Sequence, residues 1–262
     1  MWPMPEPFRI LAQVREDQLG FAADPVGQFD GPIWAKHKWN SPLRPYCVAN
    51  EVICAELGRF IGLPIPPYAV TYPEGTEQRF WFSSLKFSFG AREDRPVLGD
   101  RVVECLPEVA AGIVVFDVLV ANADRHDENL KVDNMNAPTQ VRVYDHDQAL
   151  FGGGSTPTQG IPRLQQMHGR LGITGSTTTG GTRHELLNHF NTNVHFGSWC
   201  HRIGEIPASF IERLCDSCRQ YELSREAADE AKNFLNDRKW GLREILNRNK
   251  QEFTGVEHWV TL

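Results

Sequence analysis

The sequence predicts an α+β fold in two lobes, a small β-rich lobe followed by a larger, mainly helical one. Its 262 residues correspond to one large domain, since a typical domain has roughly 150 residues. Short strand-like runs separated by Gly and Pro dominate before residue 88, whereas helical periodicity dominates afterwards. We therefore expect an N-lobe over residues 1–88 and a C-lobe over residues 89–262.

The N-lobe pattern predicts a small sheet that carries one helix. A Gly- and Pro-rich stretch over residues 20–31 is expected to form turns. The helix mixes apolar and charged residues and ends at Gly62, which Pro64 follows. The strands are predicted at Phe8–Val14, Pro32–Trp39, Tyr68–Tyr72 and Gln78–Leu85, and the helix at Cys47–Ile61.

The C-lobe pattern begins with a helix over Leu106–Ala123 that is apolar on nearly every side, which indicates a buried position. A hairpin follows it, and two amphipathic helices close the chain. Stretches 152–160 and 172–182 are rich in Gly, Ser and Thr, so we expect loops there. The hairpin strands are predicted at Leu130–Val132 and Val141–Tyr144, and the closing helices at Pro207–Tyr221 and Arg225–Asn249.

Composition narrows the classes of function. The net charge of −6 argues against a broad nucleic-acid-binding face, although it leaves room for a local basic site. The longest apolar run, Val109–Ala123, contains Asp117 and is shorter than the roughly 20 residues that a bilayer requires. Because the first residues do not read as a secretory signal and six cysteines have irregular spacing, we expect a cytoplasmic protein with reduced thiols.

Polar side chains gather between the buried helix and the hairpin. Asp124 and Asn129 lie five residues apart in the segment Asn122–Asn129, and Asp145 follows the second hairpin strand. Two carboxylates and one amide directed at a common point provide the oxygen ligands that Mg²⁺ prefers beside substrate phosphates. The pattern therefore predicts a phosphoryl-transfer site. The chain contains no Gly-x-x-x-x-Gly-Lys-Ser/Thr motif, which excludes the P-loop class.

These residues resemble the catalytic loop and metal-binding Asp of the protein-kinase-like superfamily, in the Asp-Arg-His-x-x-Asn form of the HipA-like kinases and phosphatidylinositol kinases. The HipA-like form is the more similar. Two further segments resemble that family's N-lobe helix and the turn after it, namely Ala49-Asn-Glu-Val and Gly62-Leu-Pro-Ile-Pro-Pro67. A third resembles its lysine-bearing strand, Ile33-Trp-Ala-Lys36. The resemblance covers residues 30–150.

The resemblance implies a role for each of five residues. Asp124 is expected to be the catalytic base for the acceptor hydroxyl, and Asn129 and Asp145 are expected to hold Mg²⁺. Lys36 is expected to contact the ATP phosphates, and Glu51 to hold Lys36 by an ion pair. No Gly-x-Gly-x-x-Gly pattern occurs over residues 20–31, so the phosphate-covering loop has no assigned position.

Three of these assignments have competitors in the sequence. Lys38 lies on the same strand face as Lys36, two residues away. Glu56 lies on the same helix as Glu51, and Asp147 is an alternative to Asp145 as a metal ligand. His126 and His146 are expected to support the loop by hydrogen bonds, because two imidazoles would indicate a zinc site rather than a magnesium site.

The function implied by the resemblance is ATP- and Mg²⁺-dependent transfer of the γ-phosphoryl group to a hydroxyl, most simply a protein Ser or Thr. A lipid or metabolite acceptor is the alternative within the enzyme class. A catalytically inactive, kinase-like binding module is the alternative outside it, and the presence of Asp124, Asn129 and Asp145 argues against that module. An antitoxin-like protein partner is compatible with the family.

Overall fold

We describe a computed structural model, in which residues 7–10, 26–28, 34–73, 80–85, 97–152, 157–174 and 184–262 are described. Within them, five strands form one sheet in the order β1-β4-β5-β3-β2. The strands are antiparallel neighbours except β1 and β4, which pair in parallel. They are β1 (Pro7–Ile10), β2 (Val26–Gln28), β3 (Trp34–Trp39), β4 (Tyr68–Pro73) and β5 (Trp81–Leu85).

The register of β3 and β5 sets the direction of the two candidate lysines. Lys36 lies opposite Ser84 and Lys38 lies opposite Phe82. Because side chains alternate between the faces of a strand, these two lysines share one face and His37 takes the other. Both lysines therefore reach the same side of the sheet.

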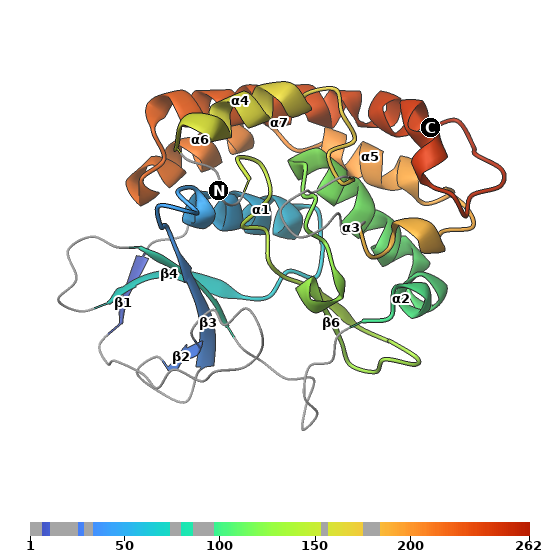
Figure 1. Ribbon diagram of the computed structural model, residues 1–262, viewed down its shortest axis with the longest axis horizontal. Coiled ribbons are helices and arrows are strands. Elements are labelled where there is room, and N and C mark those ends of the chain that lie inside the picture. The colour runs from blue at the N-terminus through green and yellow to red at the C-terminus, as the bar shows by residue number, and fades with distance from the viewer. Residues whose placement is uncertain are drawn as a thin grey trace.

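Helix α1 (Cys47–Phe60) lies between the sheet and the helical part of the molecule (Figure 1). Its residues are buried from Cys47 to Gly58, so both sides of the helix are covered. Gly58 allows the following segment to approach closely, since a Cβ there would lie 2.8 Å from Ile65 Cγ1. The helix ends before Gly62, whose φ of 81° favours glycine.

Helix α3 (Pro107–Val120) is the buried helix that the apolar run predicts. Every residue from Ala110 to Val120 is buried, and Pro107 occupies the first turn, where a missing N–H has no cost. The helix ends at Ala121, which has a left-handed backbone with φ of 51°. The other helices are α2 (Gly99–Cys105), α4 (Pro157–Met167), α5 (Phe196–Gly204), α6 (Ala208–Ser217) and α7 (Arg225–Arg248).

A short 3-10 turn (Asp127–Asn129) and the hairpin of β6 (Leu130–Val132) and β7 (Val141–Val143) follow α3. Both strands point alternate residues into the core, in agreement with the predicted hairpin. Helices α4 and α7 lie together over the far side of α1 and α3 (Figure 1). None of the described helices is long and apolar enough to cross a membrane.

The α+β class is confirmed, and so are the predicted helices of α1, α3, α6 and α7. The expected loop over residues 152–160 is wrong in its second half, because α4 begins at Pro157. The expected turn region over residues 20–31 contains β2, whose backbone pairs with β3. Parts of three predicted strands lie outside the described residues, namely the part of Phe8–Val14 after Ile10 and the first two residues of both Pro32–Trp39 and Gln78–Leu85.

Candidate functional site

The loop that contains Asp124 is held by a carboxylate inside α3. Asp117 is fully buried and accepts two hydrogen bonds from Arg125, at 2.8 Å from Nε and 2.9 Å from Nη2. Asn122 Nδ2 and His184 Nε2 contact the same carboxylate, each at 3.0 Å. Burial alone raises the pKa of Asp117, but Arg125 and His184 outweigh it and hold this pKa well below its usual range.

Arg125 also joins this loop to the end of the hairpin. Its Nη1 donates to the carbonyl oxygens of Asn129, at 3.0 Å, and of Tyr144. The Tyr144 N–H in turn donates to the Asn129 carbonyl at 3.1 Å. Asn129 and Asp145 therefore come from adjacent pieces of backbone, as the sequence pattern predicts.

Asp124 is half-buried, and two neighbours orient it. Asn129 Nδ2 donates to its backbone carbonyl at 2.7 Å, and Gln148 Nε2 donates to its Oδ2 at 2.9 Å. Burial raises the pKa of Asp124, and the negative charge of Asp145 adds to this effect. Asn129 thus fixes the backbone of Asp124, and Gln148 fixes its carboxylate.

Lys38 lies at the centre of the acidic groups. Its side chain is 5% exposed, and its Nζ lies 2.9 Å from Glu51 Oε1. The same Nζ contacts Asp145 Oδ1 and lies 3.7 Å from Asp147 Oδ2. One buried cation therefore joins the sheet, α1 and the segment after β7.

The expected ion pair between Lys36 and Glu51 is corrected, because Glu51 pairs with Lys38. Lys36 is 41% exposed, and its Nζ lies 3.7 Å from Asp145 Oδ2. Both lysines face the same side of β3, but Lys38 is nearer the chain connection into α1, where Glu51 lies one turn from the helix start. Glu56 instead accepts a hydrogen bond from the Tyr68 hydroxyl at 2.7 Å.

Asp145 and Asp147 have opposite electrostatic environments. Burial raises the pKa of Asp145, but Lys38 and Lys36 together hold it well below its usual range. Burial and the Asp145 charge raise the pKa of Asp147 to about 8, although Arg44 Nη1 lies 2.8 Å from its Oδ2. Asp145 is thus the more readily ionised of the two carboxylates.

The donor chemistry of this region agrees with a magnesium ion. Asp145 supplies an ionised carboxylate, and Asn129 uses its Nδ2 toward Asp124, which leaves Oδ1 as its oxygen donor. Within the described chain, no group of three or more His, Cys, Asp and Glu side chains is arranged to hold a metal.

The two histidines have supporting positions. His126 Nδ1 accepts a hydrogen bond from the Glu128 N–H at 3.3 Å, within the loop, as expected. His146 is buried, with Nδ1 3.8 Å from Glu51 Oε2 and its ring edge against Phe116. His146 thus packs behind the Lys38 and Glu51 pair.

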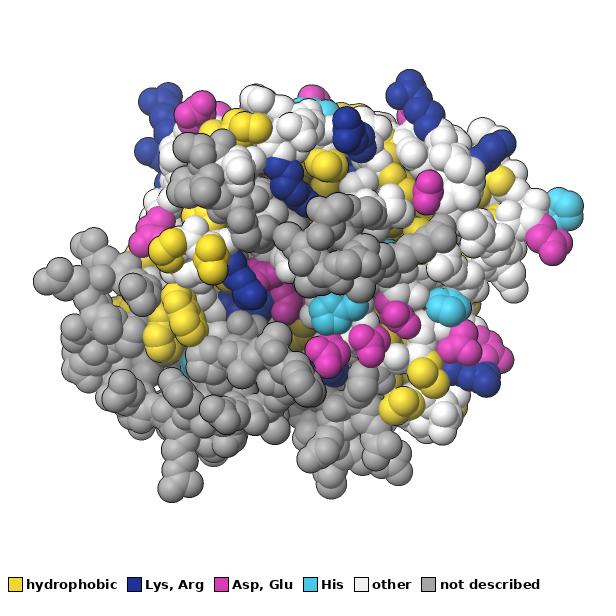
Figure 2. All heavy atoms as spheres, in the orientation of Figure 1, with side chains coloured by type: hydrophobic (Ala, Val, Ile, Leu, Met, Phe, Trp, Pro, Cys, Tyr) yellow, Lys and Arg dark blue, Asp and Glu magenta, His cyan; other side chains and the backbone are white. Residues whose placement is uncertain are grey.

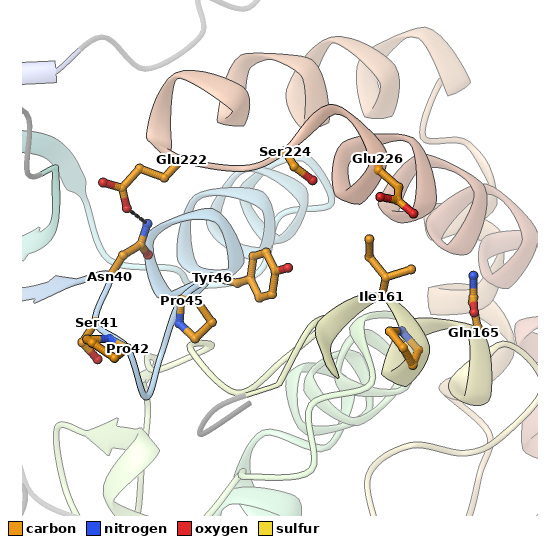
Figure 3. Close-up of a pocket in the computed structure, with 11 residues that line it drawn as sticks. Asn40, Ser41, Pro42, Pro45, Tyr46, Ile161, Gln165, Glu222, Ser224 and Glu226 are labelled. Carbon is orange, nitrogen blue, oxygen red and sulfur yellow. Dashed lines mark hydrogen bonds between the residues drawn. The ribbon is translucent and has the colours of Figure 1, made fainter. Parts of the chain in front are cut away.

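Two cavities lie in this part of the molecule. A small one, about 30 Å³, is lined by Lys36, Lys38, Asp145 and residues of α1 and β5. Figure 2 shows basic and acidic side chains gathered in the middle of one face of the molecule. A larger cavity of about 840 Å³ lies between the start of α1, α4 and the start of α7, and none of the predicted site residues lines it (Figure 3).

Sequence reasoning assigned no role to several residues that build the site. Asp117 was visible only as a charge within an apolar run, and Arg125 only as part of the loop motif. The contacts of Gln148, Arg44 and His184 depend on packing between distant segments, so no local pattern reveals them.

Residues 36–156 match the family model described as HipA-like kinase. This segment is similar to the HipA-like kinases. The resemblance found in the sequence is thereby confirmed, and with it the class of phosphotransferases. The matched segment includes β3 from Lys36 onward, α1, the Asp124 loop and Asp145, which are the parts that converge in the site.

Solved structures with a similar fold include the proinflammatory kinase CtkA of Helicobacter pylori, with a TM-score of 0.62 and 13% identity. The match covers 94% of this chain and 99% of that one. HipA of Shewanella oneidensis MR-1, from a complex with HipB and operator DNA, has a TM-score of 0.41 and 13% identity over 97% of this chain and 70% of that one. No curated protein matches the chain.

Proposed function

We propose that the chain transfers the γ-phosphoryl group of ATP to a hydroxyl in a Mg²⁺-dependent reaction, with a protein Ser or Thr as acceptor. The observation that carries the proposal is the buried Lys38, which contacts Glu51 and Asp145 beside the Asp124 loop. In-line phosphoryl transfer requires mainly positioning and neutralisation of charge, and these groups provide both.

Each side chain has a part in this proposal. Lys38, held by Glu51, contacts the ATP phosphates in place of Lys36, which lies at the more exposed side of the cleft. Asn129 and Asp145 hold Mg²⁺, which when bound supplies positive charge against the phosphate oxygens. Asp124, oriented by Gln148, accepts the proton of the acceptor hydroxyl.

The nucleotide lies between the two lobes in this proposal, the N-lobe over residues 1–88 and the C-lobe over residues 89–262. The small cavity lined by strands β3 and β5 on one side and by residues 143–146 on the other supports this division. The kinase named in the Helicobacter pylori structure supports the reaction class. A protein hydroxyl as acceptor rests on the resemblance to the HipA-like family.

Labelling with γ-labelled ATP tests the proposal. Purified protein is incubated with labelled Mg-ATP and a cell lysate, and the label is counted separately in protein, lipid and small-molecule fractions. Label on protein Ser or Thr that is absent with Asp124→Asn would support the proposal. Label found only in lipid or metabolites would show that the acceptor is not a protein. Absence of transfer by the wild type would favour the catalytically inactive binding module.

A further inference from the structure

Arg163 in α4 reaches two pieces of backbone that belong to the site. Its Nη2 donates to the Ala121 carbonyl at 2.9 Å and to the Gln148 carbonyl at 3.3 Å, and its Nη1 donates to the Leu150 carbonyl. No carboxylate of the described residues pairs with Arg163. Burial lowers its pKa to about 10, so the guanidinium remains charged near neutral pH.

Two of these three carbonyls belong to residues with left-handed backbone. Ala121 has a φ of 51° and Leu150 a φ of 43°, a region that residues other than glycine seldom occupy. The cost is of order 1–3 kcal/mol for such a residue, and the conformation persists where neighbouring structure enforces it. Arg163 therefore binds the backbone at two residues whose conformation is unfavourable.

These points border the catalytic segments. Ala121 ends α3 and directly precedes the loop that carries Asp124. Leu150 lies in the segment after Asp145, where Gln148 donates from its side chain to Asp124 Oδ2 at 2.9 Å. A single guanidinium thus joins the start of the Asp124 loop to the segment that supplies both Asp145 and Gln148.

We propose that Arg163 is a positioning residue for phosphoryl transfer, which fixes the Asp124 loop against the Asp145–Leu150 segment through three carbonyl contacts. The inference rests on the proposed roles of Asp124 and Asp145. Arg163 touches neither ATP nor acceptor in this account. It acts by keeping Gln148 within hydrogen-bond distance of the Asp124 carboxylate.

A second arginine serves as a matched control. Arg238 in α7 is also buried, and it also binds the end of α3, with Nε at 3.1 Å from Val118 O and 3.0 Å from Leu119 O. Its guanidinium also donates to carbonyls at the end of α4 and just after it, at Met167, His168, Arg170 and Leu171. Arg238 therefore supports α3 without contacting the segment after Asp145.

The test compares Arg163→Met, Arg163→Lys, Gln148→Met and Arg238→Met with the wild type. The assay measures turnover of γ-labelled Mg-ATP as transferred plus released phosphate, at a temperature below each variant's unfolding range. We expect Arg163→Met to lower kcat by about 10- to 100-fold with an ATP KM within about threefold, since a 1 Å displacement can cost about a hundredfold. Arg163→Lys should recover part of kcat, and Arg238→Met should lower Tm while keeping kcat within about threefold.

Gln148→Met separates positioning from general support of the fold. If Arg163 acts through Gln148, Gln148→Met lowers kcat alone, and the double variant with Arg163→Met is no worse than the more impaired single variant. Gln148→Met is at a partly exposed position, so it also provides a result if Arg163→Met folds poorly.

Three results would overturn the inference while leaving the proposed function in place. These are an unimpaired kcat in Arg163→Met, an equal loss of kcat in Arg238→Met, and an unimpaired kcat in Gln148→Met. Absence of turnover by the wild type would instead overturn the proposed function, and the positioning role with it. The wild-type measurement therefore distinguishes the two failures.

Discussion

Removal of the Lys38 charge is the most direct perturbation of the site. Lys38→Met keeps most of the aliphatic stem but removes the ammonium group between Glu51 and Asp145. Lys36→Met is the matched control, because Lys36 lies on the same face of β3 and also faces Asp145, at 3.7 Å. The two variants thus differ mainly in burial and in the contact with Glu51.

The structure predicts very different losses of stability for the two substitutions. Lys38 is 5% exposed, and breaking a buried ion pair by removing one partner costs about 3–5 kcal/mol. Lys36 is 41% exposed, and an exposed pair contributes about 0–1 kcal/mol. At about 2–4 °C for each kcal/mol in a chain of this size, Lys38→Met should lower Tm by roughly 6–20 °C and Lys36→Met by at most about 4 °C.

The pH dependence of this loss of Tm follows from the shifted pKa values of two carboxyl groups. Lys38 lowers the pKa of Asp145 and Glu51 in the folded protein, against the effect of burial. That stabilisation is present above the pKa of unfolded carboxyl groups and is lost as pH falls through the folded values. Without Lys38, burial raises both pKa values, so the loss of Tm should be largest at about pH 7 to 8 and smaller near pH 4.

Thermal unfolding of the three proteins between about pH 4 and pH 8 measures this directly. Binding of Mg-ATP, measured by isothermal titration near neutral pH, provides the functional readout. Lys38→Met should weaken binding more than Lys36→Met, which reverses the ranking that the sequence motif suggests. A larger effect of Lys36→Met on both Tm and affinity would refute the placement of Lys38 in the site.

Three further predictions concern the acidic groups. Asp124→Asn should abolish transfer yet keep most of the thermal shift caused by Mg-ATP, whereas Asp145→Asn should lose most of that shift. The shift is measurable because ligand at about 100 times Kd adds roughly 2.7 kcal/mol of stability. Full transfer by both variants would show that the site is misplaced. ATP should bind more weakly in excess chelator, as measured by titration, and equal affinity with and without chelator would remove the assignment of a metal to Asn129 and Asp145. Asp117→Asn should lower the free energy of unfolding by about 3–5 kcal/mol, because it leaves Arg125 buried without its carboxylate; a loss below about 1 kcal/mol in denaturant titration would contradict this.

The motif residues were predictable because the loop and the strand after it are local in sequence. Asp124 and Asn129 lie on one short loop, and the hairpin returns the chain to Asp145. The choice between Lys36 and Lys38 was not predictable from alternation, which places both on one face. It depends on where α1 crosses the sheet, and hence on tertiary packing that brings Glu51 to Lys38.

Helix α4 shows a different reason why a prediction from the sequence was wrong. Its sequence contains Pro157, Gly160 and Pro162, which are typical of loops. Pro157 can begin a helix because its missing N–H would have no partner there. Gly160 lets the helix approach Tyr46, whose ring occupies the space that a side chain would need. Packing against Tyr46, just before α1, therefore overrides the local preference, and it brings Arg163 to the site.

The end of α3 explains how a loop with charged residues keeps a defined shape. A helix leaves its last carbonyl groups without intrahelical partners, and here they receive donors from three other elements. Arg238 donates to Val118 and Leu119, the Leu150 N–H donates to Val120 at 2.7 Å, and Arg163 donates to Ala121. Since the Asp124 loop starts at the next residue, its position is set by a fixed helix end. Loss of the Arg163 donor, which binds the residue next to the loop, should therefore alter the geometry of phosphoryl transfer before it alters the fold, whereas loss of the Arg238 donor should mainly lower Tm.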